Sequence, residues 1–336
     1  MQEYSGRKVL VTGADGFIGS HLTERLAAEG AEVTALACYS SFDSHGWLDD
    51  LPYATRMRLD LRRGDVRDAK FIHSLVRGQE IVFHLAALIA IPYSYVAPQS
   101  YVDTNVLGTL NVLEAAREHR VTRVVHTSTS EVYGTALTVP IHEDHPLQGQ
   151  SPYSASKIGA DMMAEAFARS FGLPVAVLRP FNTFGPRQSE RAIISSVIRQ
   201  ALDPACDVIE IGDISTVRDF NYVRDTADAF VKLGMAPEIE YGRPYNAGSG
   251  TAVTIAEVIE HIADLTRCNK PVRQTPERMR PENSEVRALL ADSARLFEAT
   301  GWRAQVTLED GLATTIRWWQ NRLDHHLVRS ATTFVT

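Results

Sequence analysis

The first half of the chain alternates short apolar runs with segments in which apolar residues recur every three or four positions. The apolar runs predict buried strands at Val9–Thr12, Glu32–Ala37, Ile81–Leu85, Val124–Thr127 and Val175–Leu178. The intervening segments predict helices at Ile18–Glu29, Ala69–Val76, Val106–His119 and Ser154–Ser170. Strands that alternate with helices are typical of an α/β fold, in which a doubly wound parallel sheet carries helices on both faces.

After Arg179 the pattern changes, because turn-forming residues crowd together before two further helices at Ile255–Thr266 and Leu308–Gln320. The change predicts a second, smaller α/β domain. The segment Phe220–Leu233 resembles a strand end and a helix that return to the first domain. We therefore expect a first domain at 1–179 that also receives about 218–240, a second domain at 180–217 and 241–325, and a tail at 326–336.

Composition narrows the class of protein. The chain has 336 residues, 44% of them apolar, and a net charge of −7, which gives no basic surface for nucleic acid. No apolar run approaches a membrane span, and the N-terminus lacks a signal-peptide layout. The three cysteines are far apart, so we expect no metal site and no disulfides, as in a cytoplasmic protein.

A glycine-rich loop, Thr12–Gly19, joins the first expected strand to the first expected helix. Gly13, Gly16 and Gly19 let the backbone turn tightly and approach a pyrophosphate, while the helix N-terminus offers free N–H groups. A glycine trio at this position predicts the Rossmann fold and an NAD(P) cofactor. The same loop adds three expected cofactor contacts, Asp15, Phe17 and Ile18.

The choice between NAD and NADP depends on the end of the second strand, where an acid usually binds the ribose. The segment Ala37–Ser41 holds neither that acid nor an Arg for a 2′-phosphate. Both cofactors stay open, and the missing cation favours NAD. Asp65 and Val66 are candidates for the adenine, with a simple surface turn as the competing interpretation.

Tyr153 and Lys157 are four residues apart, which places a phenol and an ammonium on one helix face. A nearby cation favours phenolate, so Tyr153 could serve as a base at neutral pH. The pair follows the strand end at Thr127 on a chain that already carries the glycine loop. This position favours a catalytic pair over a surface pair.

Together, these motifs resemble the extended short-chain dehydrogenase/reductase family over nearly the whole chain. The matching pieces are the glycine loop, Asp65-Val66, His84-Leu85-Ala86-Ala87, Asn105, Thr127-Ser128-Thr129, Tyr153 with Lys157, and Arg179-Pro180-Phe181-Asn182. The resemblance implies that Tyr153 is the base, Lys157 holds the nicotinamide ribose and Thr129 assists at the sugar. It gives His84 a structural role and implies cofactor contacts at Leu85, Ala86, Ala87, Thr127 and Pro180.

The segment Ser128–Gly134 narrows the reaction because it carries Glu131. A carboxylate here resembles the nucleotide-sugar 4,6-dehydratases and the UDP-glucuronate decarboxylases, whereas 4-epimerases lack it. Oxidation at carbon 4 of a hexose makes the carbon 5 proton acidic, and a carboxylate can then remove it. Ser130 stands where dTDP-glucose dehydratases have Asp, so we expect Glu131 itself, or water, to protonate the leaving 6-hydroxyl.

Three motifs in the second region predict the diphosphate site of a sugar nucleotide, at Arg179–Gln188, Thr216–Val223 and Arg280–Asn283. By resemblance, Asn182, Arg218 and Arg280 contact the pyrophosphate, and Arg187 is a further substrate-binding candidate. Guanidinium groups bind phosphate oxygens bidentately, although a surface salt bridge is the commoner fate of any single Arg. The most similar subgroup is the UDP-N-acetylglucosamine 4,6-dehydratases of the legionaminic-acid type, which the chain resembles at Tyr39–Asp49, Asn182–Gln188 and Arg218–Asp225.

The expected protein is a lyase that converts UDP-N-acetylglucosamine, or another nucleotide-hexose, to a 4-keto-6-deoxy sugar with tightly bound NAD. A UDP-glucuronate decarboxylase is the first alternative and a 4-epimerase the second. A regulatory protein that binds the cofactor without turnover is the alternative from another class.

We also expect a homodimer. The helices that carry Leu107 and Met162 have apolar residues on more than one face, and the surplus could pair with a second subunit or lie under the second domain.

Overall fold

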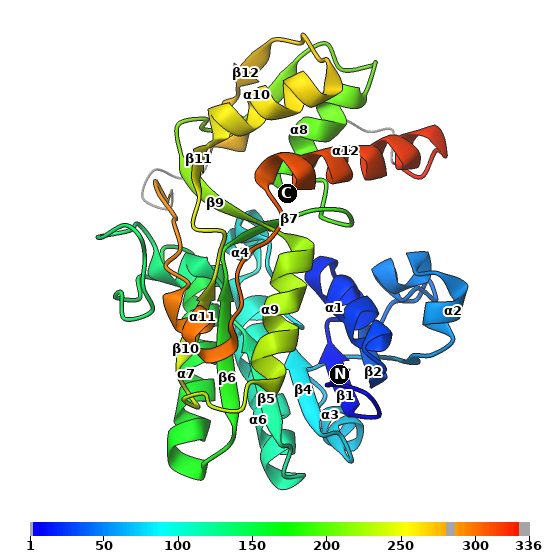
Figure 1. Cartoon of the computed structure of the whole chain (residues 1–336), viewed down its shortest axis with the longest axis vertical. Helices are drawn as coiled ribbons and strands as arrows, with labels where there is room; N and C mark the ends of the chain where they lie inside the picture. The colour runs from blue at the N-terminus through cyan, green and yellow to red at the C-terminus, as the bar shows by residue number, and fades with distance from the viewer. Residues whose placement is uncertain (1–2, 280–285, 329–336) are drawn as a thin grey trace.

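The computed structural model describes residues 3–279 and 286–328. Seven parallel strands form its central sheet in the order β10-β6-β5-β4-β1-β2-β3 (Figure 1). Their bounds are β1 Lys8–Thr12, β2 Glu32–Cys38, β3 Asp60–Gly64, β4 Ile81–His84, β5 Arg123–Thr127, β6 Val175–Pro180 and β10 Pro244–Ala247. The strand order reverses between β1 and β4, which is where open α/β sheets bind their ligands. The predicted Rossmann-type α/β fold is confirmed.

Helices cover both faces of this sheet because successive strand residues point to opposite sides. Val9 and Val11 pack in one core with α1 and α9, while Leu10 packs in the other with α3, α6 and α7. These helices run α1 Phe17–Ala28, α3 Ala69–Val76, α6 Gly108–Glu118, α7 Pro152–Phe171 and α9 Val223–Met235. A π-helical turn, η2 Val102–Leu107, precedes α6 where one continuous helix was expected.

A smaller unit lies above the sheet in Figure 1 and has its own apolar core. It contains a three-stranded sheet, β11-β9-β7, and a two-stranded sheet, β12-β8. The bounds are β7 Asn182–Phe184, β8 Ile209–Ile211, β9 Val217–Tyr222, β11 Ala252–Thr254, β12 Val272–Gln274, α8 Ile193–Leu202, α10 Ile255–Thr266 and α12 Leu308–Asp324. The remaining short elements are η1 Gly46–Asp50, α2 Tyr53–Arg56, α4 Ile91–Val96, α5 Pro98–Tyr101, η3 Ser130–Tyr133, η4 Pro276–Arg278 and α11 Ala294–Thr300.

The structure differs from the expected domain boundaries at two strands. β10 was expected in the second domain, but it pairs with β6 as the seventh strand of the large sheet. β9 was expected mainly in the first domain, but it pairs with β7 and β11, and only the following helix α9 packs on α1. Both strands are short and include buried polar residues, so their sequences lack a clear alternating pattern.

Residues 3–279 and 286–328 lack two kinds of feature. No helix there combines the length and apolar character that a membrane span requires. In the same residues, no three His, Cys, Asp or Glu side chains gather as a metal site would require.

Candidate active site

One cleft of about 1110 Å3 runs along the carboxyl ends of the large-sheet strands and under the smaller unit. Every site residue predicted from the sequence that lies in the described range lines this cleft, from the glycine loop through Glu131, Tyr153 and Lys157 to Arg218. Arg280 lies outside the described residues. The roles of these residues stay predictions, but the structure brings the predicted set together.

The first glycine of the loop leaves no room for a side chain. Gly13 has a φ of +68°, and a Cβ atom there would lie 2.7 Å from Ala86 N at the end of β4. A Cβ atom on Gly19 would lie 2.0 Å from Gly13 O. The backbone therefore leaves a shallow cradle at the N-terminus of α1, which suits the pyrophosphate of a dinucleotide.

The cofactor half of the cleft, which carries the predicted cofactor contacts from Gly13 to Val66, also contains residues that the motifs did not predict. Asp65 accepts hydrogen bonds from Arg67, with Arg67 Nη2 2.5 Å from Asp65 Oδ2, and this pairing lowers the pKa of the Asp65 carboxyl. Trp47 and Cys38 line the cleft beside them. Trp47 lies in the insertion after β2, and its backbone N–H donates a hydrogen bond to Asp15 O. No local sequence pattern predicts this contact.

Two local caps place the reaction centre. Ser151 caps α7, since its Oγ accepts from Ser154 N, and this positions Tyr153 in the first turn. Thr129 caps η3 in the same way, since its Oγ1 accepts from Glu131 N. Glu131, Thr129 and Tyr153 thus approach the cleft from two adjoining helix starts.

The electrostatics of Tyr153 differ from the sequence-based expectation. Burial raises the pKa of the Tyr153 phenol and the negative charge of Glu131 raises it further, while a hydrogen bond with the Thr129 side chain opposes both. Lys157 directs its Nζ to Thr127 O at 2.6 Å, and burial lowers its pKa to about 8. The protein groups described do not by themselves produce a phenolate at neutral pH, because desolvation outweighs the favourable interactions.

Two buried oxygens in the cleft have no hydrogen-bond partner among the described residues, Thr127 Oγ1 and Asn182 Oδ1. Buried polar atoms in folded proteins are nearly always paired, so such atoms beside a large cleft indicate a ligand. Thr127 lies in the cofactor half and Asn182 in the predicted substrate half. The residues present therefore fit a dinucleotide next to a second polar ligand.

The substrate half contains more arginines than the motifs suggested. Arg218 lines the cleft as predicted, and so do Arg191 and Arg278, which sequence reasoning missed. Arg187 also lines the cleft, but its Nη2 lies 2.9 Å from Glu24 of α1. The guanidinium of Arg187 is thus partly committed to a structural pair between the two units.

His84, read from the sequence as structural, is buried at the end of β4. Its ring nitrogens lie 2.8 Å from Thr12 Oγ1 and 3.0 Å from Thr109 Oγ1, and burial holds its pKa well below the ordinary value. A neutral imidazole held between two hydroxyls supports the fold and is not exposed to the cleft.

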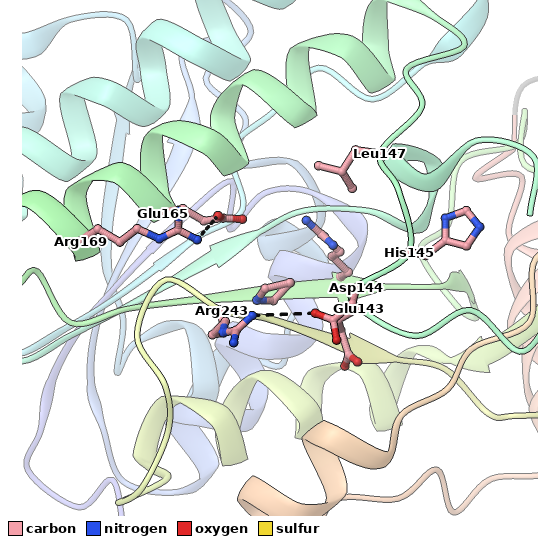
Figure 2. Close-up of a pocket in the computed structure, with 9 residues that line it drawn as sticks. Glu143, Asp144, His145, Leu147, Glu165, Arg169 and Arg243 are labelled. Atoms are coloured by element: carbon pink, nitrogen blue, oxygen red, sulfur yellow. Dashed lines mark hydrogen bonds and ion pairs between the residues drawn. The ribbon is translucent and has the colours of Figure 1, made fainter. Parts of the chain in front are cut away.

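A second, smaller pocket of about 160 Å3 lies beside α7 and β10 (Figure 2). Its charges are paired with one another: Arg169 lies 3.1 Å from Glu165, and Arg243 lies 3.8 Å from Asp144. Burial raises the pKa of Glu165. This pocket contains none of the predicted site residues.

Comparison with known proteins places the chain among nucleotide-sugar enzymes. The family model described as GDP-mannose 4,6 dehydratase matches residues 10–315. The chain is 34% identical to a UDP-glucose 4-epimerase of Mycolicibacterium smegmatis over 94% of this chain and 99% of that protein. It is 33% identical to a dTDP-glucose 4,6-dehydratase of an Actinoplanes species over 93% and 98% of the two chains.

Solved structures give the same mixture of activities. A UDP-N-acetylglucosamine 4-epimerase from Methanobrevibacter ruminantium superposes with a TM-score of 0.85, at 30% identity and 95% and 99% coverage. A dTDP-glucose 4,6-dehydratase from Streptomyces venezuelae, solved with NAD bound, gives a TM-score of 0.82 at 29% identity and 94% and 98% coverage. The bound NAD of that relative agrees with the cofactor expected from the sequence.

Proposed function

The chain belongs to the family described as GDP-mannose 4,6 dehydratase, within the extended short-chain dehydrogenases/reductases, and from this premise we propose that it is an NAD-dependent nucleotide-sugar 4,6-dehydratase. The proposed substrate is UDP-N-acetylglucosamine and the proposed product its 4-keto-6-deoxy derivative. The relatives include both dehydratases and epimerases, so the choice between them comes from the site.

The observation that carries the proposal is the carboxylate of Glu131 beside Tyr153. Both side chains line the cleft, and the charge of Glu131 raises the Tyr153 pKa, so the two groups are within electrostatic reach. An epimerase needs a base only at the 4-hydroxyl, whereas a dehydratase also needs one at carbon 5. Glu131 supplies that second base.

The chemistry divides between these groups. Bound NAD would accept a hydride from carbon 4 and return it to carbon 6. Tyr153 takes the proton of the 4-hydroxyl and later releases it to solvent, with Thr129 hydrogen-bonded to the phenol. The positive charge of oxidised NAD would favour the phenolate that this step needs and that the protein groups alone do not produce. Glu131 takes the carbon 5 proton and delivers a proton to the departing 6-hydroxyl, which leaves as water. Protonated again from solvent, Glu131 returns a proton to carbon 5, so the 4-keto-6-deoxy product differs from the substrate by one water.

Glu131 serves as both base and acid in this scheme because Ser130 offers no acidic group. Ser130 is buried in η3 and lines the cleft next to Glu131. A hydroxyl can orient the leaving group by hydrogen bonding, but its proton is far less acidic than that of a carboxylic acid.

The experiment that tests the proposal is incubation of the purified protein with UDP-N-acetylglucosamine, UDP-glucose, UDP-glucuronate, dTDP-glucose and GDP-mannose. Mass spectrometry of the products separates the activities. Loss of water supports a dehydratase, and loss of carbon dioxide would indicate the decarboxylase. Unchanged mass with an altered sugar would indicate an epimerase, and absence of turnover would favour a regulatory protein. Denatured protein should release NAD, and free NADH should not accumulate.

We also propose that the protein is a cytoplasmic homodimer. Leu107 of η2 and Met162 of α7 remain 47% and 42% exposed, so the smaller unit does not cover the surplus apolar surface. The same helices of a second subunit could cover it. Light scattering at micromolar concentration should give twice the 37.2 kDa chain mass, and a monomer would contradict the dimer.

The three free cysteines support the cytoplasmic location, because the cytoplasm is a reducing compartment.

A further inference from the structure

A buried polar network centres on Asp161, one helical turn after Lys157 on α7. The carboxylate is fully buried. Its Oδ2 accepts hydrogen bonds from Ser128 Oγ at 2.7 Å and from Arg179 Nη2 at 3.0 Å, and its Oδ1 lies 3.2 Å from His126 Nε2. A buried charge is costly unless it is paired and hydrogen-bonded, so these contacts fix the carboxylate between α7, β5 and β6.

One arm of the network leads to Lys157. Asp161 holds Ser128, and the preceding residue, Thr127, supplies the carbonyl that accepts from Lys157 Nζ at 2.6 Å. The Lys157 ammonium and the Asp161 carboxylate are therefore both hydrogen-bonded to the carboxyl end of β5, at Thr127 and Ser128. A change at Asp161 acts on both the charge and the position of Lys157.

The other arm leads to Glu131. Arg179 Nη1 donates to the Tyr133 hydroxyl at 3.0 Å, and that hydroxyl donates to Asn246 Oδ1 at 2.7 Å. Tyr133 is the last residue of η3, the turn that carries Glu131. The Arg179 side chain thus ties this turn to Asp161 and to β10.

We propose that Asp161 is a positioning residue for both chemical groups. It keeps Lys157 charged and in place, and through Arg179 and Tyr133 it fixes the turn that presents Glu131 to the cleft. The Lys157 arm serves any reaction that begins with oxidation at carbon 4. The Glu131 arm rests on the proposed dehydratase function.

The charges around Lys157 make the first arm measurable. The titratable groups that interact electrostatically with Lys157 are Asp161 of α7, His84 of β4 and His126 of β5. Burial lowers the pKa of both histidines, so they are neutral at pH 7. Burial also lowers the pKa of Lys157 to about 8, and the Asp161 carboxylate opposes this by raising it.

Asp161→Asn keeps the size of the side chain and an oxygen acceptor but removes the charge. Loss of a close opposite charge lowers a lysine pKa by roughly one unit or more. In single turnovers that measure oxidation at carbon 4, the ratio of the wild-type rate to the variant rate should therefore rise about fivefold between pH 7 and pH 9. Asp161 also raises the Tyr153 pKa. Loss of that effect multiplies the variant rate by the same factor at every pH below the Tyr153 pKa, so it does not alter how the ratio changes with pH.

A second readout does not depend on turnover. NAD retained per chain after dialysis across the same pH series should fall at a lower pH for Asp161→Asn than for the wild type. Asp161→Glu, which restores the charge, should move both profiles back toward the wild type. A pH-independent loss in both readouts would show a merely structural role and overturn the first arm.

Two further variants complete the test. Asp225→Asn removes another buried carboxylate, which lies on α9 outside the cleft and accepts hydrogen bonds from Gln305 N and Val306 N. This variant should lower stability without shifting either pH profile. Tyr133→Phe cuts the Arg179 link and should slow water loss at least tenfold more than oxidation at carbon 4. Equal slowing of both steps would overturn the second arm. The mass of the wild-type product tests the dehydratase function separately, because the two pH profiles that report on Lys157 depend on oxidation at carbon 4 and NAD retention and not on loss of water.

Discussion

The main cleft and the small pocket of Figure 2 are both lined by charged side chains, yet they differ in whether their buried polar atoms have hydrogen-bond partners. In the small pocket, Arg169 and Arg243 lie against Glu165 and Asp144. In the cleft, Thr127 and Asn182 each keep a buried oxygen without a partner among the described residues. The paired charges satisfy one another, whereas the two unpaired oxygens border the cleft, where a bound ligand can satisfy them.

The first way to test this comparison is to remove one group from each region. Tyr153→Phe removes the proposed base, and a positioned base contributes roughly a hundred- to ten-thousand-fold in rate. Stopped-flow absorbance should show no NADH signal on mixing with the substrate. Arg243→Gln, in the small pocket, breaks a half-exposed pair and should change the rate by less than about threefold. Comparable losses in both variants would remove the distinction.

The second test compares two glycines of similar conformation. Gly13 and Gly172 have φ values of +68° and +65°, but only Gly13 would place a Cβ atom against backbone, 2.7 Å from Ala86 N. Gly172→Ala should cost about 1–2 kcal/mol from its left-handed conformation alone. Gly13→Ala should lower the melting temperature further and release NAD on purification. NAD retained equally by both variants would contradict the pyrophosphate cradle.

The third test compares two arginines within the cleft. Arg218 is buried and lines the cleft at the predicted diphosphate site, and Arg187 lines the cleft 2.9 Å from Glu24. Loss of a charged hydrogen bond costs about 1.5–3 kcal/mol, so Arg218→Gln should raise KM roughly ten- to a hundredfold. Arg187→Gln should raise it less and lower stability instead, because it leaves Glu24 without its pair. Steady-state kinetics and thermal unfolding of the two variants check this order.

The parts of the site that the sequence predicted are contiguous in the chain. The glycine loop and the Tyr153 and Lys157 pair are each short segments that spacing can reveal, and the Glu131 turn was identified by its resemblance to the dehydratases. Long-range partners escaped prediction. Arg187 and Glu24 are 163 positions apart, and Arg278 lies in a short turn without a motif.

The same distinction applies to the fold and to the electrostatics. The helices Ala69–Val76 and Ile255–Thr266 were predicted to the residue, whereas the helix predicted at Leu308–Gln320 continues to Asp324. β10 escaped notice because Asn246 interrupts its apolar pattern. The expected phenolate at Tyr153 depended on the spacing of Lys157, but the pKa depends on burial, which spacing does not reveal.

The central claim is that Glu131 removes the carbon 5 proton. The most direct measurement is conversion of UDP-N-acetylglucosamine in deuterated water by the wild type and by Glu131→Gln, with the products read by mass spectrometry and NMR. We expect the wild-type product to have lost one water and to carry solvent deuterium at carbon 5. We expect Glu131→Gln still to oxidise carbon 4 but to show neither water loss nor deuterium. Dehydration at near wild-type rate with deuterium at carbon 5 in that variant would contradict the account.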